Sequence, residues 1–412
     1  MKSRVSSAVL CGLLVVACIV GARLSVTAQP AGPRWVTAWA TSQQDLGPDG
    51  ISNATVRMIA RVTAAGEAVR IRLDNTYGDE PLAIGAAAVG QPMRGARLAP
   101  GSNRPVYFGG SAAVTIPPGG RVTSDPVPLA VRAGQDLAVS LHVPGAGVRP
   151  SRHRSALTTS YLSADGAGDV TADEAGGSFA ATTTSMWWLK AIDVRSRIST
   201  GVIVAFGDSI TDGSCANVDG YDRWEDWLAI RLALAAGEPG VHKAVVNEGI
   251  GGNTVTRAGL RPPPVSTPGI ERLERDVFSH HGVTHVVLFM GTNDIRRDAS
   301  SGGVIAGMDR IIREVQARGI AILGATIIPR HNRAPTPENS GWTPAKTVVR
   351  NRVNDWMRDE APFDGVLDFD AVMRRADDAD LLEPALDCDG IHPNVLGYYE
   401  MGRSIPLDLF AP

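Results

Sequence analysis

The chain has 412 residues, of which 44% are hydrophobic and 20% are charged, and its formal net charge at pH 7 is -3. This composition is typical of a globular protein and excludes a disordered or fibrous chain, while the length allows two domains. Because the net charge is slightly negative and no basic run occurs, nucleic acid is not expected as a partner.

The first 28 residues have the pattern of an export signal. Lys2 and Arg4 make the start positive, and the apolar run 8–20 after them is too short for a comfortable membrane span. Small residues end the segment, as signal cleavage requires. A lipidated Cys18 is the alternative, but the apolar run continues past it, so plain secretion is favoured. We therefore predict a secreted or periplasmic protein with a signal peptide over residues 1–28 and no membrane span.

Residues 35–195 are predicted to form an accessory all-β domain. Short segments such as 55–62 and 69–73 alternate apolar and polar residues, and Pro- and Gly-rich turns separate these segments. No helical period occurs between them, which favours a β-sandwich or jelly roll. A packing role beside the second domain is expected, with sugar binding by exposed aromatic side chains as the alternative.

Residues 200–412 are predicted to form a second domain, of the α/β class. The apolar run 202–206 predicts a buried strand, and helical patterns occur at 223–235 and 304–318. Strands that alternate with such crossovers indicate a parallel sheet with helices on both faces. The loop 330–347 comes after a strand end and is expected to shape the substrate pocket.

Four loops with polar residues or glycine are expected to meet at one edge of this sheet. In a parallel sheet the carboxyl ends of the strands lie at the same edge, where ligands bind in such folds. Three of the loops come directly after strand ends and the fourth precedes the last helix. They are Gly207-Asp208-Ser209, Gly251-Gly252-Asn253, Gly291-Thr292-Asn293-Asp294 and Cys388-Asp389-Gly390-Ile391-His392-Pro393.

The side chains of these loops have complementary chemistry. Ser209 is a candidate nucleophile that needs a base, and His392 is the candidate base. Asp389, three residues before His392, can bond the other ring nitrogen and fix the tautomer. Suitable donors for a developing oxyanion are the Ser209 amide, an amide of the Gly251-Gly252 pair and the Asn293 side chain. Each feature alone could be a turn, a cap or a structural histidine, but their joint occurrence favours catalysis.

Two cysteines remain outside the export segment, and both lie near these loops. Cys215 lies six residues after Ser209, and Cys388 directly precedes Asp389. An isolated pair of cysteines in an exported protein is more often bridged than free. We therefore predict a disulfide between Cys215 and Cys388, with two unrelated buried thiols as the alternative.

The four blocks, in this order, resemble those of the SGNH (GDSL-type) hydrolase family over about residues 200–405. The resemblance implies a three-layer, flavodoxin-like fold with Ser209 as nucleophile and His392 as base and acid. It further implies that Asp389 orients His392.

The same resemblance implies an oxyanion hole built from the Ser209 amide, the Gly252 amide and the Asn293 side chain. Gly252 is chosen over Gly251 because it lies five residues after Asn247, as in the Asn-x-x-x-x-Gly pattern of the family.

The whole chain, including its β domain, is similar to a secreted bacterial subgroup described as xylan-esterase-like or arylesterase-like. This similarity implies a serine carboxylic-ester hydrolase that acts through an acyl-enzyme on short acetyl esters, with acetylated polysaccharide as one substrate. A lipase- or lysophospholipase-like acylhydrolase and an acyltransferase are the enzymatic alternatives, and a sugar-binding protein is the non-enzymatic one.

Two other classes of enzyme are disfavoured by the sequence. The chain has no Gly-x-Ser-x-Gly motif, which argues against an α/β-hydrolase. Its eight histidines form no pair with metal-ligand spacing, so neither a metal nor another cofactor is expected. The sequence predicts no particular oligomeric state.

Overall fold

The computed structural model describes residues 32–235, 242–336 and 340–411. The predicted signal peptide and the alternative lipidated Cys18 lie outside the described residues. Within the described ranges, no helix is both long and apolar enough to cross a membrane.

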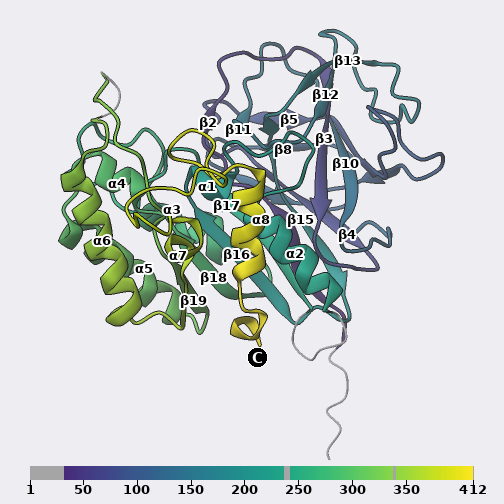
Figure 1. Cartoon of the computed structure of the whole chain (residues 1–412). Coiled ribbons are helices and arrows are strands. Elements are labelled where there is room, and N and C mark those ends of the chain that lie inside the picture. The colour runs from purple at the N-terminus through teal and green to yellow at the C-terminus, as the bar shows by residue number, and fades with distance from the viewer. Residues whose placement is uncertain (1–31, 236–241, 337–339, 412) are drawn as a thin grey trace, which may run out of the picture. The chain divides into compact units, whose positions relative to one another are not determined.

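The first half of the described chain is an antiparallel β-rich region (Figure 1). Its four-stranded sheet has the order β1 (Arg34–Ala40), β15 (Leu189–Ser196), β4 (Val69–Asp74) and β9 (Arg121–Thr123). Its six-stranded sheet has the order β13 (Phe179–Thr183), β12 (Ser160–Ser163), β3 (Ala54–Val62), β10 (Gln135–Val143), β6 (Ala86–Gly90) and β7 (Arg104–Val106). Smaller sheets join β14 (Met186–Trp187), β11 (Ser151–His153) and β2 (Asp45–Leu46), and join β5 (Leu82–Ile84) to β8 (Val114–Ile116).

Strand β3 shows why the alternating segments became strands. Val56 and Met58 belong to the main core, whereas Ile59 packs with Ala138 in a separate small cluster. Successive side chains of a strand point to opposite faces, so the period of two in the sequence divides β3 between two packed faces.

The second half of the described chain contains a five-stranded sheet in which every pairing is parallel. The strand order is β17 (Lys243–Gly249), β16 (Gly201–Gly207), β18 (Val283–Phe289), β19 (Ala321–Ala325) and β20 (Gly365–Leu367). The α-helices are α1 (Ser209–Asp212), α2 (Trp224–Leu234), α3 (Gly269–Leu273), α4 (Thr292–Arg296), α5 (Ser301–Gln316), α6 (Pro344–Asp359), α7 (Phe369–Met373) and α8 (Val395–Ser404). A π-helical turn, η1 (Glu274–Phe278), continues α3, and a 3-10 turn, η2 (Leu407–Phe410), ends the described chain.

The central strand β16 explains why helices cover both faces of the sheet. Val202, Val204 and Phe206 pack into the same core as residues of α5, whereas Ile203 and Ala205 pack with residues of α2 and α8. In Figure 1, α2 and the yellow α8 lie beside each other, as their contacts require. The predicted class, a parallel sheet flanked by helices after an antiparallel β-rich region, is confirmed.

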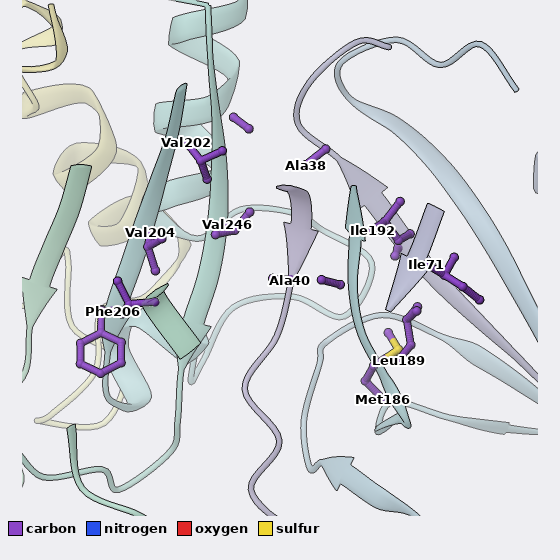
Figure 2. Packing of buried hydrophobic residues seen from close by; sticks show 14 of the residues in the cluster. Ala38, Ala40, Ile71, Met186, Leu189, Ile192, Val202, Val204, Phe206 and Val246 are labelled. Atoms are coloured by element: carbon purple, nitrogen blue, oxygen red, sulfur yellow. The ribbon is translucent and has the colours of Figure 1, made fainter. Parts of the chain in front are cut away.

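One hydrophobic core runs through both regions. Figure 2 shows Val204 and Val246 of the parallel sheet in the same cluster as Ala40 and Ile192 of the β-rich region. Residues 33–412 accordingly form one unit of dense contacts, and the boundary that the sequence places between two domains stays a prediction.

Buried charges also connect the two regions. The Lys190 ammonium of β15 lies 2.8 Å from Glu248 Oε2 and 2.8 Å from Asp276 Oδ1, and it donates to the Thr41 carbonyl at 3.0 Å. An ammonium has three donors, so all three are satisfied. Burial alone would raise the pKa of Asp276, but Arg275 and Lys190 hold it well below its usual range.

Arg272 extends this network to the end of β16. Its guanidinium donates to the Gly207 carbonyl at 3.0 Å, to the Glu248 carbonyl at 2.9 Å and to Asp276 Oδ2 at 3.1 Å. Gly207 and Glu248 lie at the carboxyl ends of neighbouring strands, so the Arg272 guanidinium holds these two strand ends together.

We expect Lys190→Met to lower the free energy of unfolding by about 3–5 kcal/mol, because the buried Glu248 and Asp276 carboxylates lose a shared cation. Urea unfolding followed by circular dichroism measures this change. Arg310→Met is the matched control: Arg310 is exposed and paired with Glu314, so its loss should change stability by about 0.5 kcal/mol or less. A Lys190→Met protein as stable as this control would contradict a stabilising role for the network.

Candidate functional site

Ser209 lies at the carboxyl edge of the parallel sheet, where β16 ends and α1 begins. A Cβ on Gly207 would lie 2.1 Å from Thr211 Oγ1, so the turn after the strand requires glycine. The Asp208 carboxylate accepts a hydrogen bond from the Ile210 amide at 3.0 Å and caps α1. This local structure presents Ser209 at the edge of the sheet.

The structure brings Ser209, His392 and Asp389 together in a chain of hydrogen bonds. Ser209 Oγ lies 3.0 Å from His392 Nε2, and His392 Nδ1 lies 3.0 Å from Asp389 Oδ2. When Nδ1 donates to the carboxylate, Nε2 is left as the acceptor for the Ser209 hydroxyl. This geometry suits a hydroxyl nucleophile with a histidine base.

The turn from Asp389 to His392 is held by its own carboxylate. Asp389 Oδ1 accepts hydrogen bonds from the Ile391 amide at 3.0 Å and from the His392 amide at 2.9 Å. Gly390 has a φ of 80°, in the left-handed region, which glycine adopts without strain. The spacing of three residues therefore places the carboxylate against the ring.

The predicted disulfide between Cys215 and Cys388 is present and connects the segment after α1 to the turn that carries Asp389. The two Cα atoms lie 6.5 Å apart, across 173 residues of sequence. The Cys215 sulfur also lies near Asp389 and His392, in a group whose spacing could hold a metal. Because this sulfur is bonded to Cys388, it offers no thiolate to such an ion.

The loop Gly251-Gly252-Asn253, called the glycine block below, has one glycine amide that donates a hydrogen bond and one that does not. Gly251 N–H donates to Asp212 Oδ2 at 2.8 Å. The Gly252 amide has no hydrogen-bond acceptor among the described residues, and a Cβ on Gly252 would meet open space. Of the two glycines, Gly252 is therefore the one whose amide is available to a bound group.

Asn293 lies in α4, buried beside the loop that precedes Ser209. Its side-chain amide is 3.4 Å from Asp208 Oδ2, a long hydrogen bond. Burial raises the pKa of Asp208 to about 7. Asp294, the residue after Asn293, accepts hydrogen bonds from the Val255 and Thr256 amides. It thereby holds the chain just after the glycine block.

The β-rich region contributes a side chain to this site that the sequence did not reveal. His153 of β11 is buried, with Nε2 at 2.8 Å from Asp212 Oδ1 and Nδ1 at 2.8 Å from the Ser42 carbonyl oxygen. Both nitrogens face acceptors, an arrangement that favours the doubly protonated imidazolium. Burial alone would lower the pKa of His153, but the Asp212 carboxylate and the carbonyl acceptors together raise it.

A continuous path therefore runs from the β-rich region to the glycine block. His153 holds one oxygen of Asp212, and the other oxygen accepts from the Gly251 amide. Asp212 lies one helical turn after Asp208. This spacing could have identified Asp212 from the sequence as a neighbour of Ser209. His153 gave no such signal, because it is 59 residues away from Asp212 in the chain.

Part of the loop that was predicted to shape the pocket lies at the site. The His331 amide donates to the Gly390 carbonyl at 2.9 Å, so this segment packs on the turn with Asp389. Trp342, in contrast, is 1% exposed, and its Nε1–H donates to Thr347 Oγ1 at 3.0 Å, so it is a core residue.

Comparisons with solved structures find several esterases. A lipolytic protein of the G-D-S-L family from Desulfitobacterium hafniense is 20% identical over 49% of this chain and 96% of that chain, with a TM-score of 0.37. A carbohydrate acetylesterase from Sinorhizobium meliloti is 19% identical over 50% and 95% of the two chains, with a TM-score of 0.36. A protein described as an arylesterase, from Agrobacterium tumefaciens, is 25% identical over 50% of this chain and 95% of that chain, with a TM-score of 0.36.

At TM-scores this low, the structural likenesses carry no inference about substrate. A comparison with curated proteins finds no significant match. Residues 205–399 match the model of the GDSL-like lipase/acylhydrolase family. The xylan-esterase-like or arylesterase-like subgroup stays a prediction. The stretch that carries Ser209, Asn293 and His392 is therefore similar to a family of hydrolases that act on esters.

Proposed function

We propose that the protein is a serine carboxylic-ester hydrolase that works through an acyl-enzyme. The observation that carries this proposal is the hydrogen-bond chain from Ser209 Oγ through the His392 ring to the Asp389 carboxylate, with 3.0 Å at both ends of the ring. The family match of residues 205–399 supports the same class of reaction.

In the proposed mechanism, Ser209 Oγ attacks the ester carbonyl while His392 Nε2 takes the hydroxyl proton. The Gly252 amide, the Ser209 amide and the Asn293 side chain stabilise the oxyanion of the tetrahedral intermediate. His392 then protonates the leaving alcohol, and the acyl group stays on Ser209. A water that gives its proton to His392 attacks the acyl-enzyme, and His392 returns this proton to Ser209 Oγ as the acid leaves. Asp389 keeps the ring oriented and stabilises the imidazolium.

Short acetyl esters, including those of polysaccharides, are proposed as substrates because the sequence resembles the xylan-esterase-like or arylesterase-like subgroup. A secreted or periplasmic location is proposed as well, and the Cys215–Cys388 disulfide supports an oxidising compartment. Activity on p-nitrophenyl esters of rising chain length, measured beside acetylated xylan, separates a short-chain deacetylase from a lipase-like acylhydrolase.

We expect Ser209→Ala to reduce kcat/KM for p-nitrophenyl acetate by about 10⁴-fold or more, because no other group supplies the nucleophile. Asp389→Asn should cost less than His392→Ala, since the carboxylate acts through the ring. Initial rates on the three purified variants test this order. Ser404→Ala, an exposed serine at the end of α8, is the control and should retain the full rate. A Ser209→Ala enzyme with a tenth of the normal rate would refute the mechanism.

The rate should depend on pH through His392. Burial lowers the pKa of His392, Asp389 raises it, and Arg330 and Arg333 lower it, with a net shift below the ordinary 6.5. The base must be neutral to accept a proton, so kcat/KM should fall as the pH drops through a value below 6.5. In Asp389→Asn the imidazolium loses its stabilising carboxylate, so the remaining activity should fall at a still lower pH. A kcat/KM that is constant from pH 4 to 8 would exclude His392 as the base.

We also expect His153→Ala to lower kcat by about 10- to 100-fold, with a smaller change in KM. Without the imidazolium, Asp212 no longer holds the Gly251 amide firmly, and an oxyanion donor that is misplaced loses mainly transition-state stabilisation. Steady-state kinetics on p-nitrophenyl acetate give the two constants separately.

Two further variants keep this result interpretable. His142→Ala changes a histidine of the β-rich region that bonds Asn53 instead, and it should leave kcat unchanged. His153→Gln retains one donor for Asp212 and should recover part of the lost rate. If a folded His153→Ala enzyme has a kcat within twofold of the wild type, His153 does not position the glycine block.

A further inference from the structure

Three arginines gather at the proposed catalytic residues from two parts of the chain. Arg296 ends α4, one helical turn after Asn293, and Arg330 and Arg333 lie in the segment after β19. Arg333 donates to the Asp389 carbonyl at 2.6 Å, and a Cβ on Gly390 would lie 3.2 Å from the His331 ring. The segment of residues 330–333 is thus packed directly against the Asp389–His392 turn.

Arg330 is buried without an anionic partner. It is 4% exposed, and its guanidinium lies 5.3 Å from the centre of the Trp342 ring. Among residues 32–235, 242–336 and 340–411, its side chain makes no hydrogen bond and no ion pair, and Nε is fully buried without an acceptor. A buried charge is normally paired, because taking it out of water is costly.

Arg296 repeats this feature. Its Nε is also buried without an acceptor, and within the described part of the chain its guanidinium forms no ion pair. Other cations nearby have acceptors: Lys346 pairs with Asp298 at 2.9 Å, and Arg333 donates to the Asp389 carbonyl. For Arg330 and Arg296, the described residues supply neither a side-chain hydrogen bond nor an ion pair.

The nearby carboxylates do not neutralise these cations. Asp389 is bonded to His392, and burial raises the pKa of Asp208 to about 7, so Asp208 is only partly charged at neutral pH. Burial, together with the positive charges of Arg296 and Arg333, lowers the pKa of Arg330 to about 10, which still leaves it protonated. The side chains at the site therefore carry an excess of positive charge.

We propose that Arg330, assisted by Arg296, binds a carboxylate of the substrate, so that the preferred esters are acidic molecules. A guanidinium presents a planar pair of donors that matches a carboxylate, which would provide the missing partner. The proposal rests on the proposed ester hydrolysis and adds a class of substrate to it. The carboxylate could belong to the acyl part, as in a dicarboxylic half-ester, or to the alcohol part, as in an acetylated uronic acid.

Matched pairs of substrates test the proposal. For the acyl part, mono-p-nitrophenyl glutarate is compared with its neutral methyl ester; for the alcohol part, O-acetyl glucuronate is compared with O-acetyl glucose. We expect kcat/KM to be at least about tenfold higher for the charged member of one pair, because a hydrogen-bonded charge pair contributes a factor of that size. This preference should shrink at high salt, and the pair that shows it identifies the source of the carboxylate.

Substitution of Arg330 separates two roles that its charge could have. In Arg330→Met, kcat/KM should fall about 10- to 100-fold more for the charged member than for the neutral one, and Arg330→Lys should restore part of the preference. Arg310→Met is the control on an exposed arginine and should leave both rates unchanged. An equal fall for both members would mean that Arg330 serves the oxyanion instead, and would overturn the proposal.

The wild-type protein gives an independent answer if the Arg330 variants do not fold. Hydrolysis of the neutral members at a rate equal to or above that of the charged members would refute the carboxylate site but leave ester hydrolysis intact. Failure to hydrolyse any member of either pair, or any p-nitrophenyl ester, would instead refute the proposed function itself.

Discussion

The arrangement of this protein depends on a buried ammonium, that of Lys190, between the carboxylates of Glu248 and Asp276. The cation comes from the β-rich region and the anions come from the α/β region, so neither set of charges could stay buried if the two regions separated. Arg272 continues the network to the carbonyl oxygen of Gly207, the last residue of the strand that precedes Asp208 and Ser209. The position of the candidate nucleophile is therefore fixed partly by this buried charge network, which connects the end of β16 to the β-rich region.

A second connection reaches the site from the same region. The His153 imidazolium holds Asp212, and Asp212 occupies the Gly251 amide, which leaves the Gly252 amide as the available donor. Together with the shared hydrophobic core, this path makes the β-rich region a structural part of the candidate site. A detachable module for sugar binding would need neither a buried ion pair nor a buried imidazolium at its boundary. The packing role that the sequence favoured is the interpretation that these contacts support.

The sequence revealed the contacts that are local and those that a parallel sheet imposes. Asp389 and His392 are three residues apart, so their contact could be predicted from spacing, and Ser209 converges with them because the strand ends share one edge. The disulfide could be predicted for the same reason. The contact between His153 and Asp212 spans 59 residues, and that between Lys190 and Glu248 spans 58. Hydrophobic patterns do not show which buried polar residues will meet across such distances, so neither contact could be predicted.

The arginines at the site and the base are coupled through their charges. Burial lowers the pKa of His392, Arg330 and Arg333 lower it further, and Asp389 raises it. Burial and the two cations thus favour the neutral ring of this candidate base, while an anion orients it. A carboxylate bound at Arg330 would cancel part of the positive field and so raise the pKa of His392. By thermodynamic linkage, protonation of His392 would strengthen the binding of that carboxylate to the same extent. An acidic substrate would thus make the ring a stronger base at the moment when Ser209 must lose its proton, whereas a neutral ester would not. The positive charge of Arg330 would then both select the substrate and change the pKa of His392.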